Sequence, residues 1–145
     1  MNIAEVHLDC TVAALRLDPA CFAIGVDAVA LPRFRRHLEH GGRRFLERIF
    51  LAGEIAACEG RADSLAARFA AKEAATKVLG TGARGVGWHE LEIRSDAAGA
   101  PTLLLRARAR ARADALGLSH FALSLSHDGD YAFAVVVAGR RPLPH

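Results

Sequence analysis

The spacing of apolar residues in the first part of the chain predicts a strand followed by a helix. FAIGVDAVA, residues 22–30, is a continuous apolar run with Asp27 at its centre, which is typical of a buried strand that ends near that aspartate. Pro32 suits the first turn of a helix, because its missing N–H would have no partner there. The segment RFRRHLEH continues this helix, and we expect Gly41 and Gly42 to end it.

Three further helices are predicted in the middle of the chain. Residues 43–50 place their apolar side chains on one side of a short helix, and residues 52–60 predict another. The longest helix, LAARFAAKEAATKVL over residues 65–79, has Ser64 as its expected N-cap and Gly80 as its end. Alanines cover most of this helix, so we expect it to be packed on several sides.

The last third of the chain mixes strand and helix patterns. Residues 88–96, WHELEIRSD, alternate like a half-buried strand, and residues 102–106 return as its hairpin partner after the turn AAGAP. RARARARADALG, residues 106–117, predicts a helix, although its strict alternation would also suit a strand. Residues 121–128 and 131–139 predict two strands joined by a tight turn. Strands and helices without regular alternation indicate the α+β class.

Length and composition are those of one globular domain. The chain has 145 residues, of which 52% are hydrophobic and 24% charged, so it can bury enough apolar surface to fold. We expect an N-terminal extension of unknown role over residues 1–21, the domain over residues 22–139, and a loose tail over residues 140–145. No run approaches the roughly 20 apolar residues of a membrane span, and the N-terminus carries acids where a signal peptide carries Lys or Arg. We therefore predict a cytoplasmic protein without a membrane partner.

Cysteine and charge content narrow the possible partners. The three cysteines have no C-x-x-C spacing, so we expect reduced thiols rather than disulfides or a zinc site. The formal net charge is +3, and apart from Lys72 and Lys77 the basic side chains are arginines, which suit bidentate contacts with carboxylates and phosphates. An anionic partner is expected, but the small charge excess does not favour nucleic acid.

Gly80, Gly82 and Gly85 satisfy the pattern G-x-G-x-x-G, which in other settings marks a dinucleotide site. That site requires a strand before the glycines and a helix after them, whereas here a helix precedes them and a strand is expected to follow. We therefore reject a nicotinamide or flavin fold. A turn whose backbone N–H groups approach a phosphate is one remaining interpretation, and a plain glycine C-cap followed by a loop is the other.

Glu73 and Lys77 form a strip of their own on the alanine-rich helix. They could simply form an i,i+4 ion pair, worth about 0.2–0.5 kcal/mol when exposed. Alternatively a divalent cation compensates the carboxylate, since magnesium takes one or two carboxylates together with waters and phosphate oxygens. Asp27 is the obvious second carboxylate, although an N-cap or turn role is equally open for it. Lys77 would then face the phosphates as a point charge.

Four segments together resemble the holo-acyl-carrier-protein synthases, the small single-domain branch of the 4′-phosphopantetheinyl transferase superfamily. They are IGVD at residues 24–27, RFAAKEAATKVLGTG at 68–82, LEIRSDAAGAP at 91–101 and SLSHDGDYAFAVV at 124–136. The G-x-D and F-x-x-K-E-A-x-x-K signatures are specific, and all four segments follow the family's order. The resemblance implies an antiparallel sheet packed against a long central helix and shorter helices.

The resemblance also implies an activity: transfer of 4′-phosphopantetheine from coenzyme A to a serine hydroxyl of an apo acyl carrier protein, with release of adenosine 3′,5′-bisphosphate. Asp27 and Glu73 match the family carboxylates that bind magnesium against the pyrophosphate, and Lys77 completes the expected catalytic set. Lipid biosynthesis, and fatty-acid synthesis within it, is the setting that this resemblance implies, while polyketide and peptide carriers stay open.

Coenzyme A is expected to contact two further segments. One is the turn after the long helix, with Lys77, Gly80, Thr81 and Gly82. The other is the strand end with Ser126 and His127, where a structural hydrogen bond of His127 is an equally open interpretation. Ser126 and His127 are not expected to form a hydrolase dyad, because neighbouring residues on a strand point to opposite faces.

The resemblance further implies an acidic carrier protein and a homotrimer with its active site between subunits. The basic segment PRFRRHLEHGGRR is the expected carrier surface, with Arg33 as its main residue and Arg36, Arg43 and Arg44 in support. A solvated arginine face is the alternative for each of them. An alternative for the whole protein is a module of the same fold that binds coenzyme A or another anion without catalysis.

Overall fold

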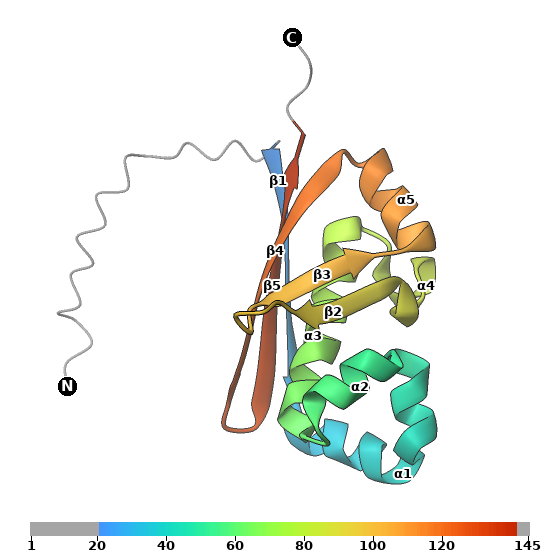
Figure 1. Cartoon of the computed structure of the whole chain (residues 1–145), viewed down its shortest axis with the longest axis vertical. Helices are drawn as coiled ribbons and strands as arrows, with labels where there is room; N and C mark the ends of the chain where they lie inside the picture. The colour runs from blue at the N-terminus through green and yellow to red at the C-terminus, as the bar shows by residue number, and fades with distance from the viewer. Residues whose placement is uncertain (1–20, 142–145) are drawn as a thin grey trace, which may run out of the picture.

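A computed structural model describes residues 21–141. Three antiparallel strands form a sheet in the order β1 (Phe22–Ala30), β5 (Tyr131–Arg140) and β4 (Leu118–Asp128). The helices and a two-stranded hairpin lie against one face of this sheet (Figure 1). The predicted α+β architecture is confirmed, and so are the two strands that were expected at the C-terminal end.

The long helix α3 (Ala62–Leu79) crosses the inner face of the sheet and is buried on nearly every side, as its alanines predict. Gly80 ends it with a φ of 66°. The expectation that Ser64 is the N-cap is wrong, because the helix begins at Ala62, three residues before the expected start, and Arg61 occupies the cap position. The N–H of Ser64 instead donates to the Asp63 carboxylate at 2.7 Å, so the acid serves this helix start.

Strand β1 differs from its prediction in two ways. It continues past Asp27 to Ala30, because its whole length pairs with β5, from Phe22 opposite Gly139 to Ala30 opposite Tyr131. It is also not buried, since it lies at the sheet edge and its outward side chains are exposed. The aspartate therefore sits within the strand rather than at its end.

The first helix is one bent element rather than two. Helix α1 (Leu31–Ile49) has a non-helical residue at Gly42, with φ 52° and ψ −137°, and then continues through the segment predicted as a separate helix. Glycine is suited to this positive φ, which side chains with a Cβ adopt only with strain. Helix α2 (Ala52–Cys58) follows as expected. Together α1 and α2 wrap around one end of α3 (Figure 1).

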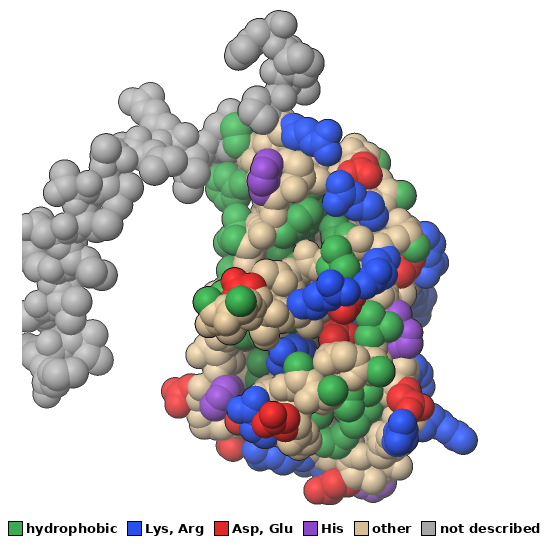
Figure 2. Space-filling view, viewed as in Figure 1, with side chains coloured by type: hydrophobic (Ala, Val, Ile, Leu, Met, Phe, Trp, Pro, Cys, Tyr) green, Lys and Arg blue, Asp and Glu red, His purple; other side chains and the backbone are tan. Residues whose placement is uncertain are grey.

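The segment after α3 contains more helix than expected. A short helix α4 (Gly82–Gly85) and a 3-10 turn η3 (Trp88–Glu90) precede the hairpin of β2 (Leu91–Ser95) and β3 (Pro101–Leu105). The predicted start of this strand at residue 88 is therefore wrong by three residues. Helix α5 (Ala107–Ala115) confirms the helical interpretation of the arginine–alanine repeat, because Ala109 and Ala113 face the core while its arginines are exposed. Figure 2 shows basic side chains over this part of the surface.

The proposed boundaries are described only in part. Residues 1–20 and 142–145 lie outside the described part of the chain, so the roles expected for the extension and most of the tail stay predictions. Strand β5 includes Arg140, one residue beyond the predicted domain end. Within residues 21–141, no helix has the length and apolarity to cross a membrane.

Candidate functional site

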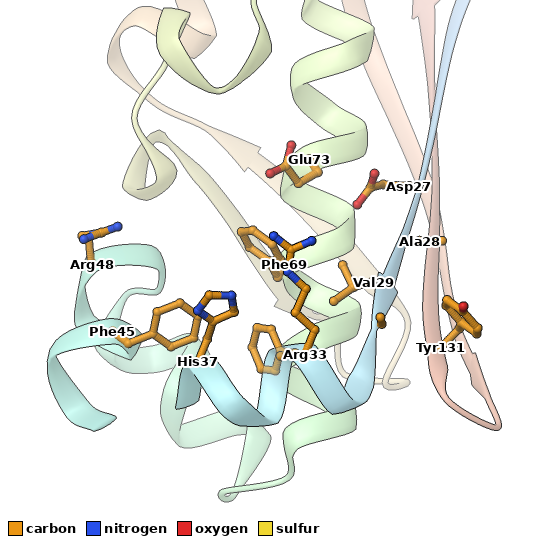
Figure 3. Close-up of a pocket in the computed structure, with 12 residues that line it drawn as sticks. Asp27, Ala28, Val29, Arg33, His37, Phe45, Arg48, Phe69, Glu73 and Tyr131 are labelled. Atoms are coloured by element: carbon orange, nitrogen blue, oxygen red, sulfur yellow. The ribbon is translucent and has the colours of Figure 1, made fainter. Parts of the chain in front are cut away.

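A cavity of about 640 Å³ lies between strand β1 and the helices α1 and α3. Asp27 of β1 and Glu73 of α3 line it together with Arg33 and Phe69. Figure 3 shows the two carboxylates next to each other at one end of the pocket, with aromatic and basic side chains of α1 at the other. The structure therefore brings together the two acids that the sequence analysis selected from segments more than 40 residues apart.

Gly25 is the reason that Asp27 and Glu73 meet. A Cβ added at Gly25 would lie 2.2 Å from the backbone oxygen of Ala74, so only glycine allows β1 to rest directly on α3 at this point. Two residues along the strand, Asp27 faces the same side, and Glu73 precedes Ala74 in the helix. In the G-x-D pattern, the glycine thus allows close packing of β1 on α3, and this packing positions the aspartate.

The electrostatics of the pocket leave negative charge incompletely compensated. Lys77 donates to Asp27 Oδ1 at 3.1 Å and to the backbone oxygen of Val26 at 2.7 Å. It thus pairs with Asp27 rather than forming the alternative i,i+4 pair with Glu73. Partial burial, and then the nearby Asp27 carboxylate, raise the pKa of Glu73, while Lys77 acts in the opposite direction. One ammonium therefore serves two carboxylates.

The far wall of the pocket is basic and aromatic. Arg33 and His37 line it from the first half of α1, and Phe45 and Arg48 from the half beyond the bend at Gly42. The rings are in contact, with centroids 5.6 Å apart for Phe34–Phe45, 6.1 Å for Phe34–Phe69 and 5.9 Å for His37–Phe45. Anionic groups entering here would meet arginines before they reach the acids.

The four arginines selected as carrier contacts do not share one hollow. Arg33 lines the pocket and also a neighbouring hollow that Arg36 and two histidines complete. Arg43 instead pairs with Glu47 one turn along α1, and Arg44 is exposed and lines neither hollow. Arg33 and Arg36 therefore lie at or beside the pocket, whereas Arg43 and Arg44 do not line it.

The residues that build the pocket lie within a segment that matches a known family. The model of the 4′-phosphopantetheinyl transferase superfamily matches residues 23–136, which include both acids and the turn after α3. The chain belongs to the 4′-phosphopantetheinyl transferase superfamily. The resemblance noted in the sequence is confirmed.

Several members of this superfamily are similar to the chain over most of their length. The holo-acyl-carrier-protein synthase of Geobacter sulfurreducens is 46% identical over 123 residues, covering 82% of this chain and 98% of that protein. That of Herpetosiphon aurantiacus is 43% identical over 120 residues, covering 78% of this chain and 94% of that protein. The crystal structure of the Helicobacter pylori synthase in complex with coenzyme A has a TM-score of 0.73 at 31% identity, covering 80% of this chain and 99% of that chain. The expected enzyme class is thereby confirmed.

The turn after α3 combines two glycines in the left-handed region with a buried hydroxyl. Gly80 and Gly82 have φ values of 66° and 59°, and the Thr81 hydroxyl is buried without a hydrogen-bond partner among the described residues. Arg112 of α5 donates to the backbone oxygen of Leu79 at 2.9 Å, which places a guanidinium beside this turn. Arg112 was not selected from the sequence, because only the fold brings α5 to the end of α3.

Ser126 and His127 do not line this pocket within a single copy of the chain. Strand β5 separates β4 from β1, and the two residues are level with Phe133 and Ala132 of β5. Ala132 is buried against the helices and Phe133 is exposed on the outer face, so the pair points to opposite sides, as expected. His127 Nε2 lies 3.6 Å from the Asp63 carboxylate at the start of α3.

Sequence reasoning missed two buried cations of α3. Lys72 is fully buried against Glu54 of α2, and Arg68 is 8% exposed with its Nε unpaired among the described residues. Arg68 donates to Cys58 Sγ and Ser95 Oγ, both at 3.3 Å. The signal was present for Lys72, because a lysine that directly precedes Glu73 must point away from the pocket side of the helix.

Proposed function

We propose that this protein transfers 4′-phosphopantetheine from coenzyme A to a serine hydroxyl of an apo acyl carrier protein, releasing adenosine 3′,5′-bisphosphate. The observation that carries the proposal is the meeting of Asp27 and Glu73 in one pocket of a superfamily member. The coenzyme A complex of the Helicobacter pylori synthase supports coenzyme A as the donor. The names of the Geobacter and Herpetosiphon relatives support an acyl carrier protein as the acceptor.

Magnesium fits the pocket through Asp27 and Glu73. Both are hard oxygen donors, and two carboxylates suffice for a cation that completes its shell with waters and phosphate oxygens. Burial and the repulsion by Asp27 raise the pKa of Glu73, and a divalent cation held by these two residues would offset the repulsion between the carboxylates. When bound, magnesium supplies positive charge against the pyrophosphate and its leaving group.

Lys77 and the turn after it suit the phosphates of coenzyme A. Glu73, Lys77 and Gly80 follow each other at steps of four and three residues, so they share one side of α3. The Lys77 side chain is 53% exposed, so its ammonium is available to a phosphate as well as to Asp27. Backbone N–H groups from Gly80 to Gly82 would continue the same path. These residues hold the phosphates in line for attack, which is most of what phosphoryl transfer asks of a protein.

The basic wall of the pocket suits an acidic carrier protein. Arg33 lies on the pocket rim and Arg36 in the adjoining hollow, where they would pair with carboxylates around the carrier serine. Arg43 and Arg44 would add long-range attraction to the same surface. The carrier then approaches from α1 while coenzyme A lies along α3, so both substrates reach the two acids.

A homotrimer fits the outer face of the sheet. This face has large exposed apolar side chains: Ile24 is 61% exposed, Val26 57%, Tyr131 50% and Phe133 39%. Exposed apolar patches of this kind mark association surfaces. Ser126 is level with Phe133 and so belongs to the same face, which agrees with a coenzyme site built between subunits.

The activity is tested by intact-protein mass spectrometry of apo carrier proteins from fatty-acid, polyketide and peptide pathways after incubation with this protein, coenzyme A and magnesium. We expect a gain of one phosphopantetheine group, lost when a chelator is added and absent when the carrier serine is replaced by alanine. No gain on any carrier, with protein shown to be folded, would favour the non-catalytic module instead.

The trimer is tested by light scattering coupled to size-exclusion chromatography. Ile24→Glu places a charge on the proposed interface and is expected to convert trimer to monomer. Leu104→Glu is the matched control, because Leu104 is an exposed apolar residue of the hairpin away from this face. A monomeric wild-type protein, or a trimer that survives Ile24→Glu unchanged, would contradict this interface.

A further inference from the structure

Lys72 and Glu54 form an ion pair with almost no access to solvent. Their side chains are 0% and 1% exposed, and Lys72 Nζ lies 2.8 Å from Glu54 Oε2. The ammonium also lies 5.2 Å from the centre of the Phe50 ring. Charges are rarely retained in such a place unless hydrogen bonds satisfy them fully, so the pair marks a point where the fold depends on specific geometry.

The pair forms hydrogen bonds with four backbone groups that belong to four different elements. Lys72 donates to the backbone oxygens of Ile49 at 2.9 Å and Trp88 at 3.0 Å. Glu54 accepts from the backbone N–H of Leu51 at 2.8 Å and of Ile93 at 2.9 Å. The end of α1, the start of α2, the turn η3 and the free edge of β2 are therefore joined through two side chains.

This joint lies directly behind the basic and aromatic wall of the pocket. Ile49 is the last residue of α1, one turn beyond Phe45 and directly after Arg48, both of which line the pocket. On the other side, the Trp88 ring packs against Phe69 of the pocket with centroids 5.4 Å apart. One ammonium thus fixes the end of α1 and the support of Phe69 to the same point of α3.

Lys72 itself does not face the pocket. It directly precedes Glu73, and successive residues on a helix point about 100° apart, so Glu73 faces the cavity while Lys72 faces the joint. Glu73 therefore belongs to the pocket, and Lys72 belongs to the structure that supports it.

We propose that Lys72, with Glu54 as its counter-ion, is a positioning residue that holds the second half of α1 in register with Glu73. The inference rests on the proposed transfer reaction and adds a role that none of the pocket residues has. When the joint is lost, Phe45 and Arg48 are no longer placed relative to the acids, and a misplacement near 1 Å can cost about 10²-fold in rate. The carrier, which contacts this wall, is affected more than coenzyme A.

Two variants separate positioning from simple stabilisation. Lys72→Met leaves the Glu54 carboxylate buried and unpaired, whereas Lys72→Met with Glu54→Gln removes both charges and should regain much of the lost melting temperature. Neither variant can bridge Ile49 to Trp88. We therefore expect the double variant to fold and bind coenzyme A within about twofold of wild type, while kcat/KM for the carrier falls by about 10²-fold. The measurements are carrier modification kinetics, calorimetric binding of coenzyme A and thermal unfolding.

A matched control and the wild type make each result decisive. Leu118→Ala creates a cavity at a buried residue of β4 outside the joint, so it should lower the melting temperature and leave the carrier KM unchanged. If the double variant has the wild-type kcat/KM for the carrier, after correction for the fraction of protein that binds coenzyme A, the positioning role is overturned and the transfer reaction is not. A wild-type protein that modifies no carrier would instead overturn the proposed function, and this inference with it.

Discussion

Two lysines of α3, five residues apart, form ion pairs of opposite character. Lys72 is fully buried, pairs with Glu54 and donates to two backbone oxygens, so all of its hydrogen-bonding capacity is used inside the protein. The Lys77–Asp27 pair has side chains that are 53% and 20% exposed. The first pair can hold structure but cannot respond to a ligand, whereas the second can exchange partners when phosphates arrive.

The difference extends to the charge balance around each lysine. Glu54 is satisfied by Lys72 and by two backbone N–H groups. At the pocket, by contrast, Lys77 cannot compensate both Asp27 and Glu73, and the pKa of Glu73 is raised by burial and by Asp27. Functional sites commonly retain such unfavourable charge arrangements at some expense in stability. Mutations at the pocket are therefore expected to lower activity more than stability, and mutations of the buried pair to lower stability.

The largest effect is expected on activity at the pocket acids. Asp27→Asn and Glu73→Gln should each lower transfer by at least about 10²- to 10³-fold, the cost of removing a group that stabilises charge in the transition state. Both variants should fold, and Glu73→Gln should melt at or above the wild-type temperature, because it removes the repulsion by Asp27. Carrier mass spectrometry and thermal unfolding measure these effects.

Glu59→Gln is the matched control for these variants, since Glu59 is an exposed carboxylate that follows α2 and does not line the pocket. It should leave turnover unchanged. Normal turnover by both the Asp27 and the Glu73 variant would remove the proposed magnesium site.

The next largest effect is expected on stability and contrasts the two lysines directly. Lys72→Met strands a buried carboxylate and should lower the free energy of unfolding by about 3–5 kcal/mol. Lys77→Met breaks a half-exposed pair and should change it by no more than about 1 kcal/mol. Urea titrations followed by circular dichroism measure both. Equal losses for the two variants would show that the exposed pair is also structural and would break the comparison.

A smaller, selective effect is expected at Arg33, whose charge is available to a partner in the way that Lys77 is. Arg33→Glu should raise the carrier KM by about tenfold, which corresponds to 1.4 kcal/mol, and leave the coenzyme A KM nearly unchanged. The difference should shrink as salt is added. Arg35→Glu makes the same charge change at an exposed α1 residue that lines neither hollow. A similar loss for both variants would indicate a general charge effect without a contact at Arg33.

The elements with strong local signals could be predicted from the sequence. The alanine-rich helix ending at Gly80, the hairpin around residues 91–105 and the last two strands follow from spacing and turn residues. Ser64 was misassigned because the helix starts at Ala62 without a side-chain cap, and such a start leaves no cap signal in the sequence. Local rules also placed a stop at Gly42, where the structure bends α1 and continues it.

Only the site residues that are unusual in their local sequence could be predicted. A carboxylate in an apolar strand and another on an alanine-rich helix both need compensation, so Asp27 and Glu73 could be proposed as partners, and the family resemblance favoured this over their alternative roles. Arg48 could not be selected, because it reaches the pocket only through the bend of α1. The partner of Lys72 could not be inferred either, since Glu54 is 18 residues away and meets it only when α2 folds back.

A third ion-pair network lies between the two extremes. Glu92 accepts from Arg94 Nε at 2.7 Å and also from Arg106, with side chains that are 10%, 56% and 47% exposed for the three residues. The hydrogen bond from Arg94 lowers the pKa of Glu92, and burial opposes this, while Arg106 acts with Arg94. The Glu92 carboxylate is largely buried, like that of Glu54, whereas its two arginine partners are about half exposed, like Lys77.

This network predicts the smallest effect, a change in how stability depends on pH. Because the pKa of Glu92 is lower in the folded chain, the unfolded chain binds more protons between the folded and unfolded pKa values. The contribution of Glu92 to stability is thus complete above its unfolded pKa and is lost as pH falls through its folded pKa. Glu92→Gln should flatten this acid limb of the melting-temperature curve slightly, because the half-exposed arginines are screened by solvent. Glu39→Gln, at an exposed acid of α1, is the matched control. An unchanged limb would mean that Glu92 behaves like an exposed acid, despite its burial.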